Sequence, residues 1–573
     1  MVATLLPLAL GLLGCRSSDY ALTASPHVLT LEVTSPTYGL FLGDESAVVT
    51  GKVAPLTAQV LVQGEPVQLA EDGTFTATLP MDGLDYRMIE VEATLATQYA
   101  RERLPVFSGT NPSESWPGEA TARLTGAGLD KLGEAVGGLV DATGWDTMIS
   151  DAIPSLDTDY VDIYATGVTH DPTVAYLEPS EDGIATQVVM GNVSLGVEIN
   201  ALDGWIVIPI EIGFEQILAD VTLTPELDDE GLLSLVISEA TIDIGKAAFE
   251  LGSLDGWLVE LIVDAISSFI EPLSTLLLDW LLEEYGVIEL GGPLDFETDL
   301  LGTTLAAKLS SLWTDTQGLG AGLGIGINES AHDGAPTIPT PGETDGLDGA
   351  HASLALHEGA FQLLLEDALI SLLADLDLGG MFGDIIGAGI EGLPGGDDAP
   401  SGDGWCVALD PGDAYVVRMK ESILPVAQLH MPDFRFEAGV EQDGDCEDWL
   451  EASLEVTINL GLEGGTALDL GVEVPGGALL YYGADPESYT EDEVVAGLGE
   501  YMGTMIGLAG GFLDFDLESL LGGLAGSGEE GDPLSAIFSD LDVEITDSRK
   551  LYNDDGTWTE GLYVLSLNLF AEE

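Results

Sequence analysis

The stretch that decides the fold is residues 255–285, DGWLVELIVDAISSFIEPLSTLLLDWLLEEY. Apolar residues recur along it at helical spacing: Trp257/Leu258, Leu261/Ile262, Ala265/Ile266, Phe269/Ile270, Leu273, Leu276/Leu277 and Trp280/Leu281. The pattern predicts one amphipathic helix of about 40 Å, capped by Asp255 and bent at Pro272. Glu260, Asp264, Glu271 and Asp279 share its polar face and disfavour a membrane span. The apolar stripe therefore faces a protein core, lipid, or both.

The composition combines a large apolar fraction with a strong acid excess. The 573 residues are 46% hydrophobic and include 101 acidic and 14 basic residues, for a formal net charge of −87. This length suggests roughly three or four domains with sizeable cores. The charge excludes nucleic acid as a partner, and no polybasic patch is present for anionic lipid headgroups. We interpret the acidic residues as a solvating surface suited to high salt or divalent cations.

Residues 1–15, MVATLLPLALGLLGC, form a short apolar segment that ends in small residues and a cysteine, as signal peptides do. The ending Leu12-Leu13-Gly14-Cys15 resembles the bacterial lipobox, which implies that Cys15 is acylated and anchors the chain in a membrane. Arg16 follows the cysteine, and the resemblance then implies sorting to the outer membrane. No Lys or Arg precedes the apolar run. An ordinary leader with an unmodified cysteine is the alternative.

The next segments predict a tether and an all-β module. Residues 16–27 are a small polar tether, and residues 28–107 contain six short alternating segments separated by turn signals. Their spacing predicts a β-sandwich that resembles bacterial immunoglobulin-like modules. The segments are LTLEV, AVVTGKV, AQVLVQ, TFTATL, MIEVEATL and RLPVF.

Two larger units of similar plan follow a linker at residues 108–120. The first, 121–328, opens with a predicted helix, ARLTGAGLDKLGEAVGGLVDA, continues in antiparallel strands with one apolar face, and contains the long helix. A Pro/Gly-rich linker, 329–349, precedes the second unit, 350–573. That unit has further strands and a second apolar helix with Val494/Val495, Leu498, Tyr501/Met502 and Met505/Ile506 on its stripe.

This order resembles the tubular lipid-binding superfamily of bactericidal/permeability-increasing, lipopolysaccharide-binding and cholesteryl ester transfer proteins. The resemblance covers about residues 120–573 and is carried by GLDKLGEAVGGLVD, the stretch 256–286, HASLALHEGAFQLLLEDALISLL and LYVLSLNLF. It implies an α+β fold of two elongated antiparallel β-barrels, each wrapped on a long helix, here preceded by the immunoglobulin-like sandwich.

The resemblance also implies apolar slots for the acyl chains of phospholipid-like ligands. The basic barrel tip that grips lipopolysaccharide in the family is missing here, so that ligand is not expected. The residues expected to contact lipid are Leu129, Leu132, Val136, Trp257, Leu258, Leu261, Ile262, Ala265, Ile266, Phe269, Leu498, Met502, Met505 and Ile506.

Cys406 and Cys446 are the two cysteines that remain besides Cys15. An exported, oxidising setting favours a disulfide between them, and closing a loop of about 40 residues would stabilise the fold by roughly 4 kcal/mol on the chain-entropy model. Free buried thiols are the alternative. The family's known disulfide lies in the first barrel, whereas both of these cysteines lie in the second unit.

The sequence contains no catalytic motif of the G-x-S-x-G, H-E-x-x-H or P-loop type, which favours a protein that is not an enzyme and has no cofactor. The leading interpretation is an exported, membrane-anchored lipid-binding or lipid-transfer protein. The rival is a cell-surface adhesion lipoprotein in which the barrels are scaffold, and a hydrolase comes third. Acidic loops could hold Ca²⁺ but lack EF-hand spacing, and solvated loops are favoured. Their carboxylates are Asp397, Asp398, Asp403, Asp443 and Asp445.

The lipobox resemblance generates the first prediction. Labelled palmitate should enter the wild-type protein and not Cys15→Ser, because the serine hydroxyl replaces the thiol that takes the acyl chain. Both variants are followed by gel fluorography of whole cells. Equal labelling of the two would contradict the anchor.

Overall fold

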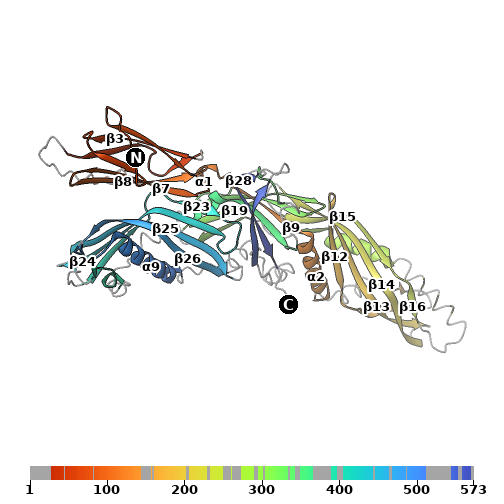
Figure 1. The fold of residues 1–573 in the computed structure, drawn as a ribbon. Helices are drawn as coiled ribbons and strands as arrows, with labels where there is room; N and C mark the ends of the chain where they lie inside the picture. Colours follow the sequence, from red (N-terminus) through yellow and green to blue (C-terminus); the bar gives the residue numbers. More distant parts are fainter. Residues whose placement is uncertain are drawn as a thin grey trace, which may run out of the picture. The chain divides into compact units, whose positions relative to one another are not determined.

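The computed structural model describes residues 28–43, 46–81, 83–142, 156–157, 161–201, 206–228, 233–249, 260, 263, 267, 273–289, 295–300, 303–332, 336–341, 349–365, 389–396, 404–442, 445–463, 467–485, 487–510, 544–552 and 558–569. These residues are mostly β-structure with few helices (Figure 1). They belong to two compact units, Met1–Gly109 and Thr110–Glu573. Among the described residues, no helix combines the length and hydropathy needed to cross a membrane.

The first unit is a sandwich of two sheets around one core. One sheet has the order β1-β3-β6 and the other β2-β8-β7-β4-β5. Residues of both sheets, such as Val49 and Val91, share the core. The alternating segments predicted six of these strands and missed the three-residue β2 and β5; the immunoglobulin-like class stays a prediction. The bounds are β1 Thr30–Ser35, β2 Leu40–Leu42, β3 Ser46–Ala54, β4 Gln59–Val62, β5 Glu65–Val67, β6 Thr74–Pro80, β7 Tyr86–Leu95 and β8 Gln98–Ser108.

The second unit begins with helix α1 and strand β9 and continues into an eight-stranded sheet. That sheet runs β10-β11-β13-β14-β15-β17, with β12 paired to β13 and β16 to β14. Its longest strands, β13 and β14, pair from Ile184↔Leu223 to Ala201↔Ile206. The bounds are β10 Leu156–Asp157, β11 Val161–Thr169, β12 Val174–Ser180, β13 Gly183–Ala201, β14 Ile206–Leu227, β15 Leu233–Ile244, β16 Ala247–Phe249 and β17 Val287–Glu289.

The stretch 255–285 is helical wherever it is described. Helix α5, Leu273–Tyr285, forms its second half, and Glu260, Val263 and Ser267 are helical residues of its first half. The expected bend at Pro272 and the cap at Asp255 lie outside the described residues.

A seven-stranded central sheet joins strands from both sides of the proline-rich segment. Its order is β18-β19-β20-β9-β21-β28-β27, so β9 pairs with β20 on one side and β21 on the other. Closure of each half into a separate barrel around a helix stays a prediction. The bounds are β9 Glu119–Thr125, β18 Asp295–Leu300, β19 Thr303–Asp315, β20 Gly318–Ile327, β21 Ala352–His357, β27 Glu544–Tyr552 and β28 Trp558–Asn568.

Strand β9 corrects the prediction for the opening helix. Residues 122–125 were expected to be helical, but they lie in β9, and helix α2 spans Gly126–Ala142. The linker expected at 108–120 is also partly ordered, because α1 (Pro112–Ser115) forms within it and β9 starts at Glu119. Asn111 caps α1 by accepting a hydrogen bond from the Ser113 amide at 3.2 Å.

Residues 336–341 of the proline-rich segment, here called the strap, are fastened to β9 at alternate positions. Glu119 accepts hydrogen bonds from the Thr337 amide (2.6 Å) and hydroxyl (2.9 Å). The Thr121 hydroxyl donates a hydrogen bond to the Pro339 carbonyl oxygen at 2.9 Å. Arg123 Nε donates one to the Pro341 carbonyl oxygen at 2.7 Å. A period of two on both segments shows that the strap runs extended over one face of β9. This part of the predicted linker is therefore held in place along β9.

The repeated glycines of β20, GLGAGLGIGI, leave room for the chain that crosses this face. A Cβ on Gly322 would meet the Pro336 ring at 2.5 Å, and one on Gly324 would meet the His332 carbonyl oxygen at 1.8 Å. Gly320 similarly lies under the Trp313 ring. Strand β20 thus has one face of apolar side chains and one face of glycines. Other parts of the chain pack closely against the glycine face.

The last sheet of the second unit has five strands and carries helix α9 (Glu491–Gly510). Thr490 and Glu493 form a capping box at the start of α9: the Glu493 carboxylate accepts from the Thr490 amide (3.2 Å), and the Thr490 hydroxyl accepts from the Glu493 amide (3.4 Å). The order is β22-β24-β25-β26, with β23 paired to β24. The bounds are β22 Gly404–Asp410, β23 Val416–Met419, β24 Ala427–Gln442, β25 Asp445–Glu463 and β26 Ala467–Tyr482.

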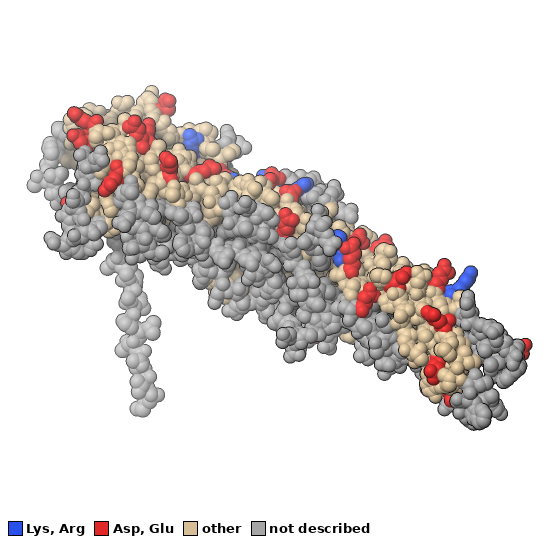
Figure 2. Space-filling model, turned by 90° about the horizontal axis from the view of Figure 1, so that it is seen from below, with Lys and Arg blue, Asp and Glu red and all other residues tan. Residues whose placement is uncertain are grey.

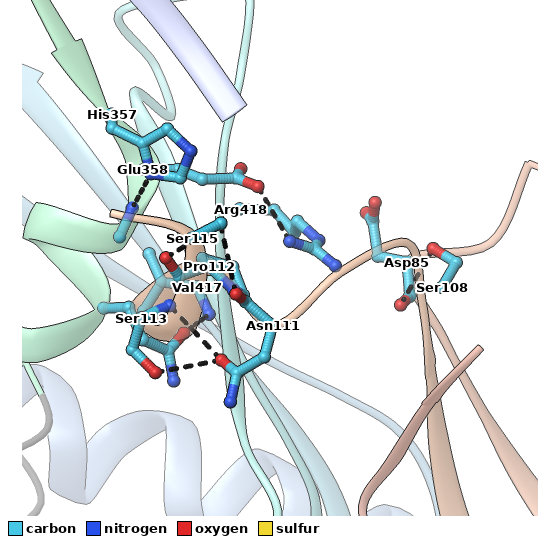
Figure 3. Close-up of polar contacts among 12 residues, drawn as sticks. Asp85, Ser108, Asn111, Pro112, Ser113, Ser115, His357, Glu358, Val417 and Arg418 are labelled. Atoms are coloured by element: carbon cyan, nitrogen blue, oxygen red, sulfur yellow. Dashed lines mark hydrogen bonds and ion pairs between the residues drawn. The ribbon is translucent and has the colours of Figure 1, made fainter. Parts of the chain in front are cut away.

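Helix α6 (Glu358–Leu365) connects the central sheet with this last sheet (Figure 3). Glu358 pairs with Arg418 of β23 at 2.8 Å, and both side chains are nearly buried. Gln362 accepts a hydrogen bond from the Val417 amide at 2.5 Å. At Gly359, α6 passes so close to α1 that a Cβ would lie 2.2 Å from the Pro112 carbonyl oxygen. The helix is thus fixed by a buried ion pair on one element and by close backbone packing on another.

The contacts of Arg123 generate a pH-dependent prediction. Arg123 forms a bidentate ion pair with Asp315, at 2.5 and 2.8 Å, and this hydrogen bonding lowers the pKa of Asp315. The stabilisation is present above the ordinary Asp pKa, about 3.9, and is lost as the pH falls through the lowered value. At pH 7, Asp315→Asn should lower the free energy of unfolding by about 1 to 3 kcal/mol.

The difference between wild type and Asp315→Asn should shrink below about pH 3.9. Urea unfolding at several pH values measures it, with the exposed Asp243→Asn as the control expected to change stability by no more than about 0.5 kcal/mol. A difference that stays constant from neutral pH to pH 3 or so would contradict the linkage.

Candidate functional site

The inner face of the eight-stranded sheet is a continuous apolar wall. Alternate residues of β13 and their register partners on β14 point to this face, for example Leu195↔Ile212 and Val197↔Ile210. All of its core members are at least nine-tenths buried, whereas their neighbours Glu198 and Glu211 are more exposed. The wall is formed by Val168, Val193, Leu195, Val197, Ile199, Ile210, Ile212 and Phe214.

Helix α2 covers one end of this sheet and packs directly on β12 (Figure 1). Leu129 is fully buried against Ala175, Leu177 and Ile184, with Leu132 and Val136 packed beside them. These three α2 residues were expected to contact lipid, and the structure places them in a cluster of protein side chains.

Two glycines explain how closely α2 approaches β12. A Cβ at Gly133 would lie 2.5 Å from the Ala175 carbonyl oxygen, and one at Gly137 would lie 2.6 Å from that of Thr173. One turn further on, Asp141 accepts hydrogen bonds from the Thr173 amide and from its hydroxyl, the latter at 2.5 Å. Helix and strand are therefore joined by apolar contact at one end and by a carboxylate at the other.

In the second half, the first three turns of α9 lie in a packed core. Leu498 and Met502, both expected to contact lipid, are buried together with Val494 against residues of β25 such as Leu454 and Val456. Of Met505 and Ile506, the structure describes the backbone, which is helical. The remaining expected lipid contacts, Trp257, Leu258, Leu261, Ile262, Ala265, Ile266 and Phe269, lie outside the described residues.

Tyr501 is a polar group in this core that the sequence did not single out. Its ring packs edge-on against Phe436 with centroids 6.5 Å apart, and a Cβ at Gly389 would meet it at 2.4 Å. Burial raises the pKa of Tyr501. Within the described part of the chain its buried hydroxyl has no hydrogen-bond partner. The stripe Tyr501/Met502 predicted burial of this position but not an unsatisfied hydroxyl.

The predicted disulfide is present. Cys406 and Cys446 are joined with their Cα atoms 6.3 Å apart. Cys406 is the register partner of Gly439 on β24, and a Cβ at Gly439 would lie 2.5 Å from the Cys446 sulfur. The bridge therefore links β22 and β25 beside β24 where that strand has no side chain.

Most carboxylates of the acidic loops lie outside the described residues. Asp445 is the first residue of β25, whereas Asp397, Asp398, Asp403 and Asp443 lie outside the described residues. No group of three or more His, Cys, Asp and Glu among the described residues is placed to hold a metal ion. Binding of Ca²⁺ by these loops stays untested.

Comparison with known proteins gives two solved structures of interest. No protein-family model and no curated protein matches the sequence. The crystal structure of lipopolysaccharide binding protein is similar over 81% of this chain and 100% of that chain, with 11% identity and a TM-score of 0.43. The solution structure of latherin matches 28% of this chain and 93% of that chain, with 14% identity and a TM-score of 0.15.

Gly137 and its neighbour Gly138 provide a matched test of the close packing of α2 on β12. Gly137→Ala should lower the free energy of unfolding by about 1 to 3 kcal/mol, because the methyl group would press on the Thr173 carbonyl. Gly138 has open space, so Gly138→Ala should instead stabilise the helix by up to about 1 kcal/mol. Urea unfolding of the two variants gives the comparison. Equal effects at the two positions would show that α2 is not held against β12.

Proposed function

We propose that this chain is an exported, membrane-anchored lipid-binding or lipid-transfer protein that holds acyl chains in apolar slots. The observation that carries the proposal is the apolar wall on β13 and β14 in the half that also contains the amphipathic stretch 255–285. Two acyl chains of ordinary length bury about 30 methylene groups at roughly 0.8 kcal/mol each, which is ample to hold a lipid away from water. The anchor at Cys15 and the outer-membrane location are part of the proposal.

The test uses one tryptophan on each face of the same sheet. Ala165 is the register partner of Val197 and lies on the apolar wall, whereas Ala185 of β13 is exposed on the opposite face. We expect wild type, prepared without delipidating detergent, to carry lipid in native mass spectrometry. Ala165→Trp should lose lipid while its melting temperature is retained, because the ring replaces acyl chain. Ala185→Trp should keep both the lipid and the melting temperature.

Two results would contradict the slot. One is that Ala165→Trp lowers the free energy of unfolding by about 1 to 3 kcal/mol while the lipid content does not change. The wall would then be an ordinary protein core, which the tryptophan overpacks. If the wild type carries no lipid, the carrier function is excluded, and the adhesion lipoprotein with scaffold barrels becomes the better explanation.

A further inference from the structure

More than half of the Lys and Arg side chains in the described chain form ion pairs with acidic partners. Seven Lys and Arg side chains lie within 4.0 Å of a carboxylate, including the buried pairs Arg123–Asp315 and Arg418–Glu358. The others are Arg101 with Glu90 and Glu92, Lys131 with Glu134, Arg435 with Asp433, Arg549 with Asp547, and Lys550 with Glu421. A cation that is already paired offers a second anion little net attraction, because binding it would weaken the existing pair.

The fold does bring four basic residues into one neighbourhood. The Ser548 hydroxyl donates to the Lys420 carbonyl at 2.9 Å, which places β27, with Arg549 and Lys550, beside the end of β23, with Arg418. The same neighbourhood contains Glu358, Glu421 and Asp547, each paired with one of these cations. Even here the local charge is nearly balanced, so the cluster is no anion-binding site.

Acidic side chains dominate the exposed face of the eight-stranded sheet that holds the apolar wall on its other side. Lys246, between β15 and β16, is the basic residue on the described part of β12 to β16. Figure 2 shows the same excess of Asp and Glu over Lys and Arg on one face of the molecule. The exposed carboxylates on the described strands of this sheet are Glu178, Glu211, Glu215, Asp220, Glu226, Glu239 and Asp243.

Like charges also crowd one another on the five-stranded sheet. Glu437 of β24 is the register partner of Glu451 on β25. Burial, together with the charges of Glu451 and Asp448, raises the pKa of Glu437. Repulsion among its own carboxylates thus already destabilises the folded protein, and an added anion at its surface would increase this repulsion.

We propose that the acyl lipid held by this protein has a headgroup without net negative charge, either zwitterionic or uncharged. The inference rests on the proposed function, which supplies the apolar slot. The acyl chains would be held by apolar burial, which does not distinguish headgroups. Selection would then come from repulsion, because an anionic headgroup meets the field of 101 acidic residues against 14 basic ones, and at least seven of those basic residues already have a carboxylate partner.

The experiment presents two lipids that differ in headgroup alone. The full chain with Cys15→Ser, which lacks the proposed anchor and so does not stay in the vesicle membrane, is incubated with vesicles of equimolar phosphatidylcholine and phosphatidylglycerol with identical acyl chains, at about 20 mM NaCl with chelator, so that repulsion is weakly screened. Both lipids come from the same vesicle, so binding of the protein to the vesicle affects them equally. Any difference in loading then reports how well the protein retains each lipid. The protein is separated by flotation, and its lipid is extracted and counted by mass spectrometry.

We expect about tenfold more phosphatidylcholine than phosphatidylglycerol in the protein, a ratio that corresponds to about 1.4 kcal/mol. The ratio should fall when NaCl is raised to about 500 mM, because salt screens the repulsion. Loading with equal or greater amounts of phosphatidylglycerol would overturn the headgroup inference and leave the proposed function standing. No loading of either lipid would overturn the proposed function, and the headgroup inference with it.

Discussion

The buried guanidinium of Arg123 is the constraint on which the centre of the second unit depends. Arg123 is 5% exposed, lies in the middle of the seven-stranded sheet, and cannot lose its charge. Such a group is tolerated only when its donors are paired. Asp315 at the end of β19 supplies the counter-charge, and the strap supplies a carbonyl oxygen. One side chain therefore fixes a hairpin end, a central strand and the connection between the two halves of the chain.

The same arrangement decides which face of the central sheet meets the core. On β9, Ala120, Ala122 and Leu124 alternate with Glu119, Thr121 and Arg123, and Ala120 belongs to the large core of the second half. A shift of one residue would put Arg123 into that core, so the register is strongly specified. Because α2 follows β9 without a break, the register also sets where α2 starts and how it reaches β12.

Much of the fold follows from patterns that the sequence displays openly. The antiparallel strands of the two larger units, the second helix α9 and the Cys406–Cys446 pair were all predicted, because each has a regular period or few possible partners. Strand β9 was missed because a seven-residue alternation that includes Ala, Arg and Leu is also compatible with the start of a helix. Its identity depends on β20 and β21, which are far away in sequence. Strands β22 to β24 were not predicted, because their sequence has no equally long alternation of apolar and polar residues.

The candidate site shows a different limit of sequence reasoning. The α2 stripe predicted that Leu129 contacts lipid, and did not predict that Gly133 and Gly137 would bring β12 close enough to fill the space beside it. Which element an apolar face meets depends on backbone distances that hydrophobic periodicity does not encode. The glycines at positions 133 and 137, four residues apart, were a usable signal, because such spacing on one helix face permits close approach to a neighbouring backbone.

The helices of the two halves cover their sheets to different extents. In the second half, α9 lies on β26 from its first turn, and Val494, Leu498 and Met502 are buried among side chains of the sheet. The first three turns of α9 are therefore occupied by contacts with the protein itself. In the first half, α2 fills only the end of the sheet beside β12, and the wall on β13 and β14 extends past it. Because the residues of that wall are themselves at least nine-tenths buried, the chain already covers them, and an acyl chain held there as proposed would have to take the place of that cover.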